Sequence, residues 1–373
     1  MESRISAIVR PAVRELHPYR AGTTIEQARR RYALTSIIKL SSNENPLGPS
    51  PRALAALREI GPLNLYEDDD RTELRTRIGA RHGVGPEAIV CGHGSNDVLM
   101  TVFETFVDVG DEVVVAQPTF SLFAKDAAVC GARVVEVALR DGVHDLGAML
   151  AAVTDRTKLV IVCDPNNPTG TTVDRETFAR FADALPERVL LTVDQAYAEY
   201  ALDRTYDAIA LVQRRPNTVV TRTLSKIYGL ASLRFGYAVT SPEVVDYLER
   251  VRTPFNVSRP AAEAALAALG DDAFLTRTLE LNEAGKTYLG REFARLGLHA
   301  YPTAANFHAV AVPVAADRAY TDLMARGVIV RSGDSLRMPG RLRITIGTQA
   351  ENEALVGAFD ALAESWREHP AMV

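Results

Sequence analysis

Short runs of β-branched residues alternate with helical patterns through the middle of this 373-residue chain. The β-rich runs are residues 88–90, 112–116, 159–162, 189–193 and 219–221, and each is too short to form a helix. Residues 97–107 lie between two of them and carry a helical pattern of Leu and Phe residues on one face. This alternation predicts an α/β fold, with a mostly parallel sheet and helices on both faces. Residues 234–240 form a further β-rich run with no helix before it, a spacing that allows an antiparallel pair.

The pattern changes after Val257. Helical patterns cover residues 261–269 and 272–296, and short strands are predicted near 306–312, 328–331 and 341–346. A closing helix follows, with Leu355, Phe359, Leu362 and Trp366 on one face. We therefore expect a smaller α+β domain, since the chain is longer than one hydrophobic core usually covers. The predicted division is an N-terminal arm with the first strand of the smaller domain (1–45), a large domain (46–256) and a small C-terminal domain (257–373).

Composition excludes several classes of function. Lys and Arg number 42 against 47 Asp and Glu, so the net charge of −5 is a poor match for nucleic acid or anionic lipid. No apolar run approaches the length of about 18 residues that spans a bilayer, and the first residues show no secretory signal. The three cysteines read as reduced thiols, and the seven histidines show no metal-ligand spacing. We expect a cytoplasmic protein with no metal site and no nucleic-acid or membrane partner.

Polar residues and one aromatic residue follow the predicted strands at their carboxyl ends, which is where ligands bind in open α/β sheets. In chain order they are Phe120, Asn167, Asp194, Tyr197, Thr223, Ser225, Lys226 and Arg234. Ahead of them, the turn at residues 92–97 (GHGSND) opens a helix, and helix N-termini attract anions. Each residue type also has an ordinary structural use, because Asp caps helices and Asn-Pro marks turns.

One cofactor uses all of these groups together: pyridoxal 5′-phosphate. Its aldehyde needs an amine, and its ring nitrogen needs an acid to remain protonated. Its phosphate needs an anion site with a cation, and its ring needs a flat apolar partner. The residues at the sheet edge therefore predict a pyridoxal-phosphate site.

Eight segments then make a family resemblance visible. They are LSSNENPLGPSP (40–51), GHGSND (92–97), QPTFS (117–121), PNNPTG (165–170), VDQAY (193–197), TLSKIYGLASLRFGY (223–237), VRTPFNV (251–257) and GVIVRSG…LRITIGT (327–348). In this order the chain resembles the fold-type I pyridoxal-phosphate aminotransferases, and within them the histidinol-phosphate aminotransferase group. The resemblance runs nearly end to end and implies the fold of that transferase class.

The resemblance implies a role for each residue that matches a family motif. Lys226 would form the internal aldimine and would later move a proton between the substrate Cα and the cofactor C4′. Asp194 would pair with the pyridine nitrogen, while Asn167 and Tyr197 would bond the phenolic oxygen. Phe120 would stack on the ring, where many relatives have Tyr.

The resemblance also implies how the phosphate and the substrate are held. The phosphate would be bound by Ser95, Asn96, Thr223, Ser225 and Arg234, with Tyr66 reaching it from the other subunit. That last role implies a homodimer with shared active sites. Arg343 would bind the anionic group of the substrate as a bidentate fork, helped by Arg331 and Tyr19, with Asn43 near the substrate.

The implied reaction is a ping-pong transamination between L-histidinol phosphate and 2-oxoglutarate, a step of histidine biosynthesis. Three alternatives stay open: an aromatic amino-acid aminotransferase, a phosphothreonine-type decarboxylase, and a transcription regulator that carries this fold as a sensor. Two departures from the family pattern, Gln195 and Ser232, should not abolish cofactor binding. The departures at Glu67, His308 and residues 332–337 put the substrate in doubt and leave the reaction type alone.

Overall fold

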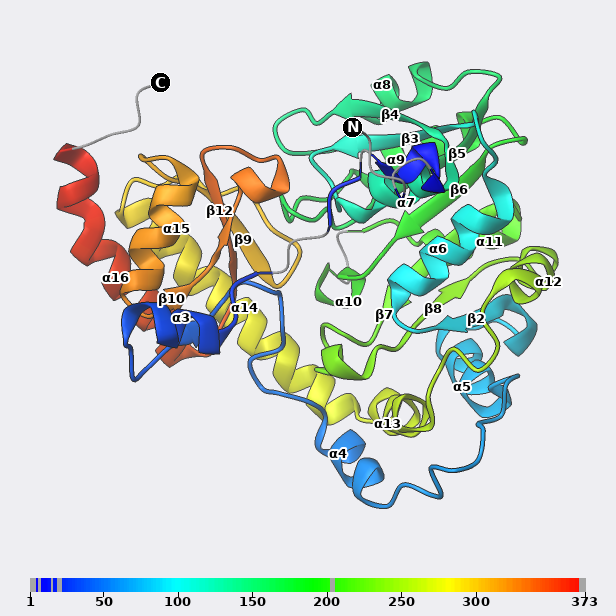
Figure 1. Ribbon diagram of the computed structural model, residues 1–373, viewed down its shortest axis with the longest axis horizontal. Helices are drawn as coiled ribbons and strands as arrows, with labels where there is room; N and C mark the ends of the chain where they lie inside the picture. The colour runs from blue at the N-terminus through cyan, green and yellow to red at the C-terminus, as the bar shows by residue number, and fades with distance from the viewer. Residues whose placement is uncertain (1–4, 6–7, 15, 19–21, 202–204, 369–373) are drawn as a thin grey trace.

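A seven-stranded sheet covered by helices on both faces forms the larger part of the molecule (Figure 1). The computed structural model describes the chain apart from residues 1–4, 6–7, 15, 19–21, 202–204 and 369–373. In spatial order the strands are β2 (Ile89–Gly92), β8 (Gly236–Val239), β7 (Thr218–Thr223), β6 (Leu190–Asp194), β5 (Thr157–Cys163), β3 (Glu112–Gln117) and β4 (Arg133–Ala138).

The direction of the strands confirms the predicted α/β class. Strands β7, β6, β5, β3 and β4 pair in parallel, and β8 pairs antiparallel with both β7 and β2. The β-rich run at 234–240 is therefore the antiparallel member. Strand β4 was missed because it lies at the sheet edge, where its residues are exposed or half-buried and show no continuous apolar run.

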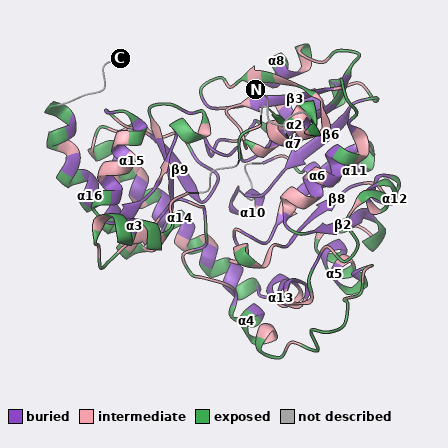
Figure 2. Cartoon of the chain, in the orientation of Figure 1, coloured by how far each residue is buried: buried purple, intermediate pink, exposed green. Residues whose placement is uncertain are grey.

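Alternate residues of the sheet pack into two separate cores, one on each face. Val113 and Val115 face one core, whereas Val114 and Ala116 face the other. The first core is covered by α6 (Ser95–Phe106), α7 (Leu122–Cys130) and α12 (Pro242–Val251). The second is covered by α4 (Pro51–Arg58), α5 (Thr72–His82), α8 (Leu146–Ala151), α9 (Arg175–Ala184), α10 (Ala198–Ala201), α11 (Ala208–Arg214) and α13 (Arg259–Leu269). Figure 2 shows the central strands as buried along their length.

The second part of the molecule is built on a three-stranded antiparallel sheet. Its order is β11 (Arg331–Ser332), β12 (Arg341–Thr345) and β9 (Phe307–Ala311), and a separate parallel pair joins β1 (Ile38–Lys39) to β10 (Val328–Ile329). The helices are α3 (Ile25–Tyr32), α14 (Asp272–Arg295), α15 (Ala316–Ala325) and α16 (Gln349–Glu368). The single strand predicted at 328–331 is two strands with different partners. Residues 328–329 pair with β1, and residues 331–332 pair with β12, so the pairing partner changes at Val330.

The closing helix α16 packs as its sequence pattern predicts. Leu355, Phe359, Leu362 and Trp366 are all buried in one core with β12 and α14. The short helix α2 (Pro11–Arg14) lies on α7, and the 3₁₀ turns are η1 (Pro86–Ala88), η2 (Ala231–Leu233) and η3 (Asp334–Leu336).

Helix α14 connects the two parts. It has 24 residues and is therefore about 36 Å long at 1.5 Å per residue. Its N-terminal Leu275 packs in the core of the large sheet, and its C-terminal Phe293 packs against the three-stranded sheet. Helix α13 packs with α4 and α5, so the large sheet's core continues past the predicted boundary at residue 257. Among the described residues, no helix is long and apolar enough to cross a membrane.

Candidate active site

A cavity of about 1200 Å³ lies beyond the carboxyl ends of β3, β5, β6 and β7. Its wall contains all but two of the residues that the sequence singled out. They are Asn43, Ser95, Asn96, Phe120, Asn167, Asp194, Tyr197, Thr223, Ser225, Lys226, Arg234, Arg331 and Arg343. The exceptions are Tyr66, which lies outside this cavity, and Tyr19, which lies outside the described residues. The structure therefore brings residues from seven of the eight family segments into one space, and the segment at 251–257 lines no part of it.

Lys226 extends from the turn after β7 into this cavity. Its Nζ donates to the backbone oxygen of Ser42 at 3.2 Å and lies 5.7 Å from the centre of the Tyr197 ring. Burial, with a further contribution from the positive charge of Arg343, lowers the pKa of Lys226 to about 8. A substantial fraction of this amine is therefore neutral, and so nucleophilic, near physiological pH.

Asp194 ends strand β6 at the floor of the cavity and is almost completely buried. Its Oδ1 accepts from the backbone N–H of Ala196 at 3.2 Å and from the Thr221 hydroxyl at 3.1 Å. Burial raises the pKa of Asp194 to about 6, and the two hydrogen bonds offset only part of this effect. A buried carboxylate of this kind is stabilised by a cationic partner, which a protonated ring nitrogen supplies.

Arg343, on β12, faces the large sheet across the cavity. Its Nη1 donates to Asn167 Oδ1 at 2.7 Å, and its Nη2 donates to the backbone oxygen of Ser41 at 2.7 Å. The side chain also lies over the Phe307 ring, 5.6 Å from its centre. These contacts hold the guanidinium in the wall of the cavity with a fixed orientation, ready to bind an anionic group.

The N-terminus of α6 forms the opposite end of the cavity. Gly94 caps this helix without a side-chain hydrogen bond, so the N–H groups of the first turn have no side-chain cap. Gly94 has φ +85°, and a Cβ added there would lie 2.5 Å from Arg234 Nη2. Glycine thus allows the Arg234 guanidinium to reach the helix end, where Arg234 also bonds the Ser225 hydroxyl at 3.4 Å. The helix dipole and the cation together make an anion-binding site. We call this site, formed by the N-terminus of α6 with Ser225 and Arg234, the anion cradle.

Tyr66 does not line the cavity of its own chain. It is 80% exposed and stacks on Phe255, with ring centres 4.4 Å apart. In the acidic run that follows (residues 67–70), Asp68 accepts a hydrogen bond from the backbone N–H of Thr72 at the start of α5. Asp69 binds Arg252 at 2.9 Å. The bond to Arg252 lowers the pKa of Asp69 to about 2.

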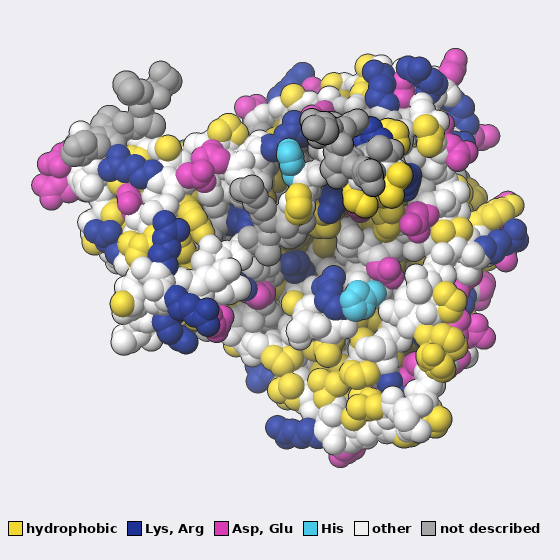
Figure 3. All heavy atoms as spheres, viewed as in Figure 1, with side chains coloured by type: hydrophobic (Ala, Val, Ile, Leu, Met, Phe, Trp, Pro, Cys, Tyr) yellow, Lys and Arg dark blue, Asp and Glu magenta, His cyan; other side chains and the backbone are white. Residues whose placement is uncertain are grey.

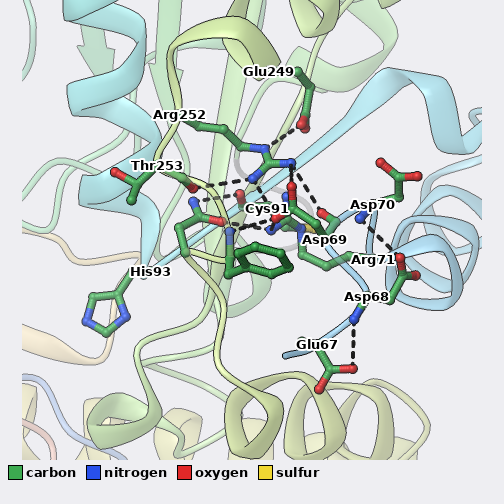
Figure 4. Close-up of polar contacts among 12 residues, drawn as sticks. Glu67, Asp68, Asp69, Asp70, Arg71, Cys91, His93, Glu249, Arg252 and Thr253 are labelled. Atoms are coloured by element: carbon green, nitrogen blue, oxygen red, sulfur yellow. Dashed lines mark hydrogen bonds and ion pairs between the residues drawn. The ribbon is translucent and has the colours of Figure 1, made fainter. Parts of the chain in front are cut away.

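A chain of polar contacts ties this segment to the anion cradle. Arg71 donates to Asn256 Oδ1 at 2.8 Å, and Asn256 Nδ2 donates to Asp97 Oδ2 at 2.8 Å. Asp97 also accepts from the backbone N–H of His93 at 2.8 Å, which fixes the turn before α6. The His93 ring itself points away from the cluster (Figure 4). Asn256 lies in the family segment at 251–257, but no signal in the sequence indicated its contacts with Arg71 and Asp97, which depend on folding.

Several cavity residues were given no site role from the sequence. Thr119, Lys125, Cys163, Asp317, Asp334, Ser335 and Arg337 belong to this group. Arg337 forms a bidentate pair with Glu136 of β4, which joins the two parts of the molecule beside the cavity. Cys163 is buried at the end of β5 with its thiol pKa raised well above the usual value by burial. This thiol is therefore protonated at neutral pH.

Comparison with known proteins gives a consistent result. The family described as aminotransferase class I and II matches residues 35–359 of the chain. A histidinol-phosphate aminotransferase of Moorella thermoacetica is 44% identical over 353 residues, which cover 94% of this chain and 92% of that protein. Histidinol-phosphate aminotransferase 1 of Cupriavidus pinatubonensis is 44% identical over 355 residues, covering 93% of this chain and 94% of that protein.

A solved structure extends the similarity to three dimensions. The histidinol-phosphate aminotransferase of Sinorhizobium meliloti, crystallised in complex with pyridoxal-5′-phosphate, superimposes with a TM-score of 0.87 at 30% sequence identity. The match covers 96% of this chain and 98% of that chain.

Proposed function

Because the chain belongs to the class I and II aminotransferase family, we propose that it transfers the amino group of L-histidinol phosphate to 2-oxoglutarate with bound pyridoxal 5′-phosphate. The observation that carries the proposal is the meeting of Lys226 and Asp194 in one cavity with an anion cradle at its end. The relatives named for this reaction match more than nine-tenths of the chain, which supports the choice of substrate.

The donor set of the cavity fits the cofactor group by group. Lys226 offers an amine of lowered pKa for the aldehyde, and Asp194 offers a buried carboxylate for the ring nitrogen. The hydroxyl of Tyr197 and the amide of Asn167 suit the phenolic oxygen, and Phe120 suits the ring face. The side-chain amide of Asn96 lies at the cradle, and its Oδ1 has no hydrogen-bond partner among the described residues. A phosphate there would accept from the NH₂ group of this amide.

The residues of the cavity divide the chemistry among them. When bound, the cofactor supplies an aldehyde that links to amines and a cationic ring that withdraws electrons from Cα. Asp194 keeps the ring nitrogen protonated, and Lys226 Nζ accepts the proton that leaves the substrate Cα and later returns it. A pKa near 8 suits Lys226 to this exchange, because both protonation states are populated near neutral pH.

Arg343 serves as the anchor for the substrate's anionic group. We propose that it binds the phosphate of histidinol phosphate in one half-reaction and a carboxylate of the 2-oxo acid in the other. Arg331 lines the same cavity and adds a second positive charge for the phosphate, and Tyr19 is proposed to assist it. Asn43, which also lines the cavity, is proposed to lie near the substrate.

A panel of amino donors tests the substrate. Purified protein is incubated with pyridoxal 5′-phosphate, 2-oxoglutarate and either histidinol phosphate or phenylalanine, and glutamate formation is measured. We expect glutamate to form with histidinol phosphate. The kcat/KM for phenylalanine should be lower by at least about 100-fold, because phenylalanine lacks the phosphate and so loses one charged hydrogen-bonding contact with the cavity. Activity with phenylalanine alone would instead identify an aromatic amino-acid aminotransferase, and CO₂ release without a 2-oxo acid would identify a decarboxylase.

We further propose that the working enzyme is a homodimer in which Tyr66 completes the partner's cavity. Exposed apolar side chains support this: Leu47, Leu54, Leu63, Leu65 and Phe255 are each at least 40% exposed. Leu63 and Leu65 lie beside Tyr66 in sequence, and Phe255 stacks on its ring. Figure 3 shows hydrophobic side chains gathered on the surface over α4 and α13. Such a patch is costly in water and is typical of a subunit interface.

Mixed dimers test the shared site. We expect chains carrying Lys226→Ala and chains carrying Tyr66→Ala to be inactive or weakly active as homodimers. In a mixed dimer, one site combines Lys226 of the Tyr66→Ala chain with Tyr66 of the Lys226→Ala chain. We expect the mixture to exceed the summed activity of the two parents severalfold. Activity no greater than that sum, with mixed dimers verified by differential tags, would show that each cavity uses residues of one chain.

The location of the protein and the division of its chain remain proposals as well. The three cysteines are free, and Cys91 and Cys163 are buried, which supports a reducing compartment such as the cytoplasm. We propose residues 1–45 as an arm with the first strand of the small domain, 46–256 as the cofactor-binding domain and 257–373 as the small domain. Helix α13 belongs to the last of these segments but packs in the core of the large sheet.

A further inference from the structure

Three consecutive residues after β1 each hold one polar side chain of the cavity. The backbone oxygen of Ser41 accepts from Arg343, and that of Ser42 accepts from Lys226. The side-chain amide of Asn43 donates from Nδ2 to the Tyr197 hydroxyl oxygen at 2.8 Å. The chain at 41–43 therefore touches the anchor, the amine and the phenol at once.

Asn43 is fixed from every side. It is 1% exposed and has φ 54°, a left-handed conformation that Asn tolerates better than most residues. Its backbone N–H donates to Thr345 Oγ1 at 2.9 Å, and its backbone oxygen accepts from Asn306 Nδ2 at 3.0 Å. Thr345 Oγ1 also lies 3.2 Å from Asn43 Oδ1.

These contacts select one orientation of the Asn43 amide. The Thr345 hydroxyl accepts the backbone N–H of Asn43, and its own hydrogen goes to Asn43 Oδ1. The amide NH₂ group then faces Tyr197. The reversed amide leaves the Thr345 hydroxyl hydrogen without an acceptor among the described residues, which is unfavourable for a buried group.

This orientation determines where the Tyr197 hydroxyl hydrogen points. A phenol has one hydrogen to donate, and here its oxygen accepts from Asn43, so its hydrogen is left for another partner. The ring cannot swing away, because it packs edge-on against Phe307 with centres 5.3 Å apart. Burial raises the pKa of Tyr197, so the hydrogen stays on the phenol at working pH. The remaining direction open to the hydrogen is the cavity that Tyr197 lines.

We propose that Asn43 is a positioning residue that directs the Tyr197 hydroxyl hydrogen toward the phenolic oxygen of the bound cofactor. The inference rests on the proposed function and assigns Asn43 a second task besides lining the substrate space. Thr345 lies on β12, two residues after Arg343. Its contact with Asn43 therefore links the Asn43–Tyr197 hydrogen bond to the strand that carries the proposed substrate anchor. A donor aimed at the phenolic oxygen stabilises its ionised form.

The variant Asn43→Asp tests this direction. Aspartate has the shape of asparagine but cannot donate, so the Tyr197 hydroxyl would turn to donate to it and away from the cofactor. The readout is the pH midpoint of the visible absorbance of the bound cofactor, measured by spectrophotometric titration without substrate. We expect the midpoint to rise by about one pH unit, the effect of one lost hydrogen bond to the ionised oxygen.

The matched control repeats the change in a Tyr197→Phe background. If Asn43 acts through Tyr197, Asn43→Asp moves the midpoint in that background by much less than in the wild type. An equal rise in both backgrounds would mean that the new negative charge acts directly, and an unchanged midpoint in both would mean that the contact does not orient the hydroxyl. Either result would overturn the inference.

A second variant keeps the test usable if Asn43→Asp does not fold, as judged by its melting temperature. Thr345→Val removes the hydroxyl that holds the amide, so it should raise the midpoint in the same direction by a smaller amount, and no change would count against the inference. A wild-type protein that gains no visible absorbance with pyridoxal 5′-phosphate would refute the proposed function itself, which separates the two failures.

Discussion

Replacing Asp194 by asparagine is expected to stabilise the cofactor-free protein above pH 6 and to change its stability little near pH 4. Asp194 is 3% exposed, and within the described part of the chain its carboxylate accepts two hydrogen bonds, from Ala196 and Thr221. Asparagine keeps an acceptor oxygen for both bonds and carries no charge. The substitution therefore isolates the cost of holding a buried negative charge with no cofactor beside it.

The size of the effect follows from the pKa. Burial raises the pKa of Asp194 from 3.8 to about 6 in the folded chain. Between these values the unfolded chain has lost its proton and the folded chain has not, so rising pH favours unfolding. A pKa difference of about two, at 1.36 kcal/mol each, gives a cost of about 3 kcal/mol that is complete above pH 6. Below pH 4 both states hold the proton and the cost disappears.

Urea unfolding of the cofactor-free wild type and the Asp194→Asn variant, at several values between pH 4 and pH 8, measures this cost. We expect the free energies of unfolding to agree within about 1 kcal/mol at pH 4 and to differ by about 3 kcal/mol, in favour of the variant, at pH 7. Added pyridoxal 5′-phosphate should then stabilise the wild type more than the variant. A variant less stable than the wild type at pH 7, or a difference independent of pH, would refute the reasoning.

Three further substitutions test individual parts of the site. Lys226→Ala should abolish the visible absorbance of the bound cofactor and lower turnover by about 10³-fold or more, with the dimer retained by size-exclusion chromatography; normal turnover would contradict the role of this amine. Arg343→Ala should raise KM about 100-fold for both the amine and the 2-oxo acid in steady-state kinetics, and an effect on one alone would mean that the two use different anchors. Gly94→Ala places a Cβ 2.5 Å from Arg234 and imposes a backbone cost of about 1–3 kcal/mol. Calorimetry should therefore show weaker cofactor binding and a lower melting temperature. Unchanged binding would mean that the anion cradle is not part of the cofactor site.

The large sheet and its ligand edge were predictable from the sequence because the signals are local. Buried strands such as β5 and β6 are continuous apolar runs, and the residues that end them, Asn167 and Asp194 among others, follow within a few positions. Once the strands are parallel, their carboxyl ends must meet at one edge of the sheet. Edge strand β4 gave no such signal, since its half-exposed residues need not be apolar.

Contacts between distant segments were not predictable in the same way. The bond from Asn43 to Tyr197 joins positions 154 apart, and the bond from Arg343 to Ser41 joins positions 302 apart. Both depend on how β1 and β12 pack against the large sheet, which no periodicity in the sequence encodes. Tyr66 shows a different limit, because its proposed task requires a second chain and its own chain leaves it exposed.

Trapping the covalent link between the cofactor and the protein tests the central claim most directly. Protein loaded with pyridoxal 5′-phosphate is reduced with borohydride, digested and mapped by mass spectrometry. The account predicts one pyridoxyl adduct, on the Nζ of Lys226 in the turn after β7. An adduct on another lysine, or none at all, would contradict it.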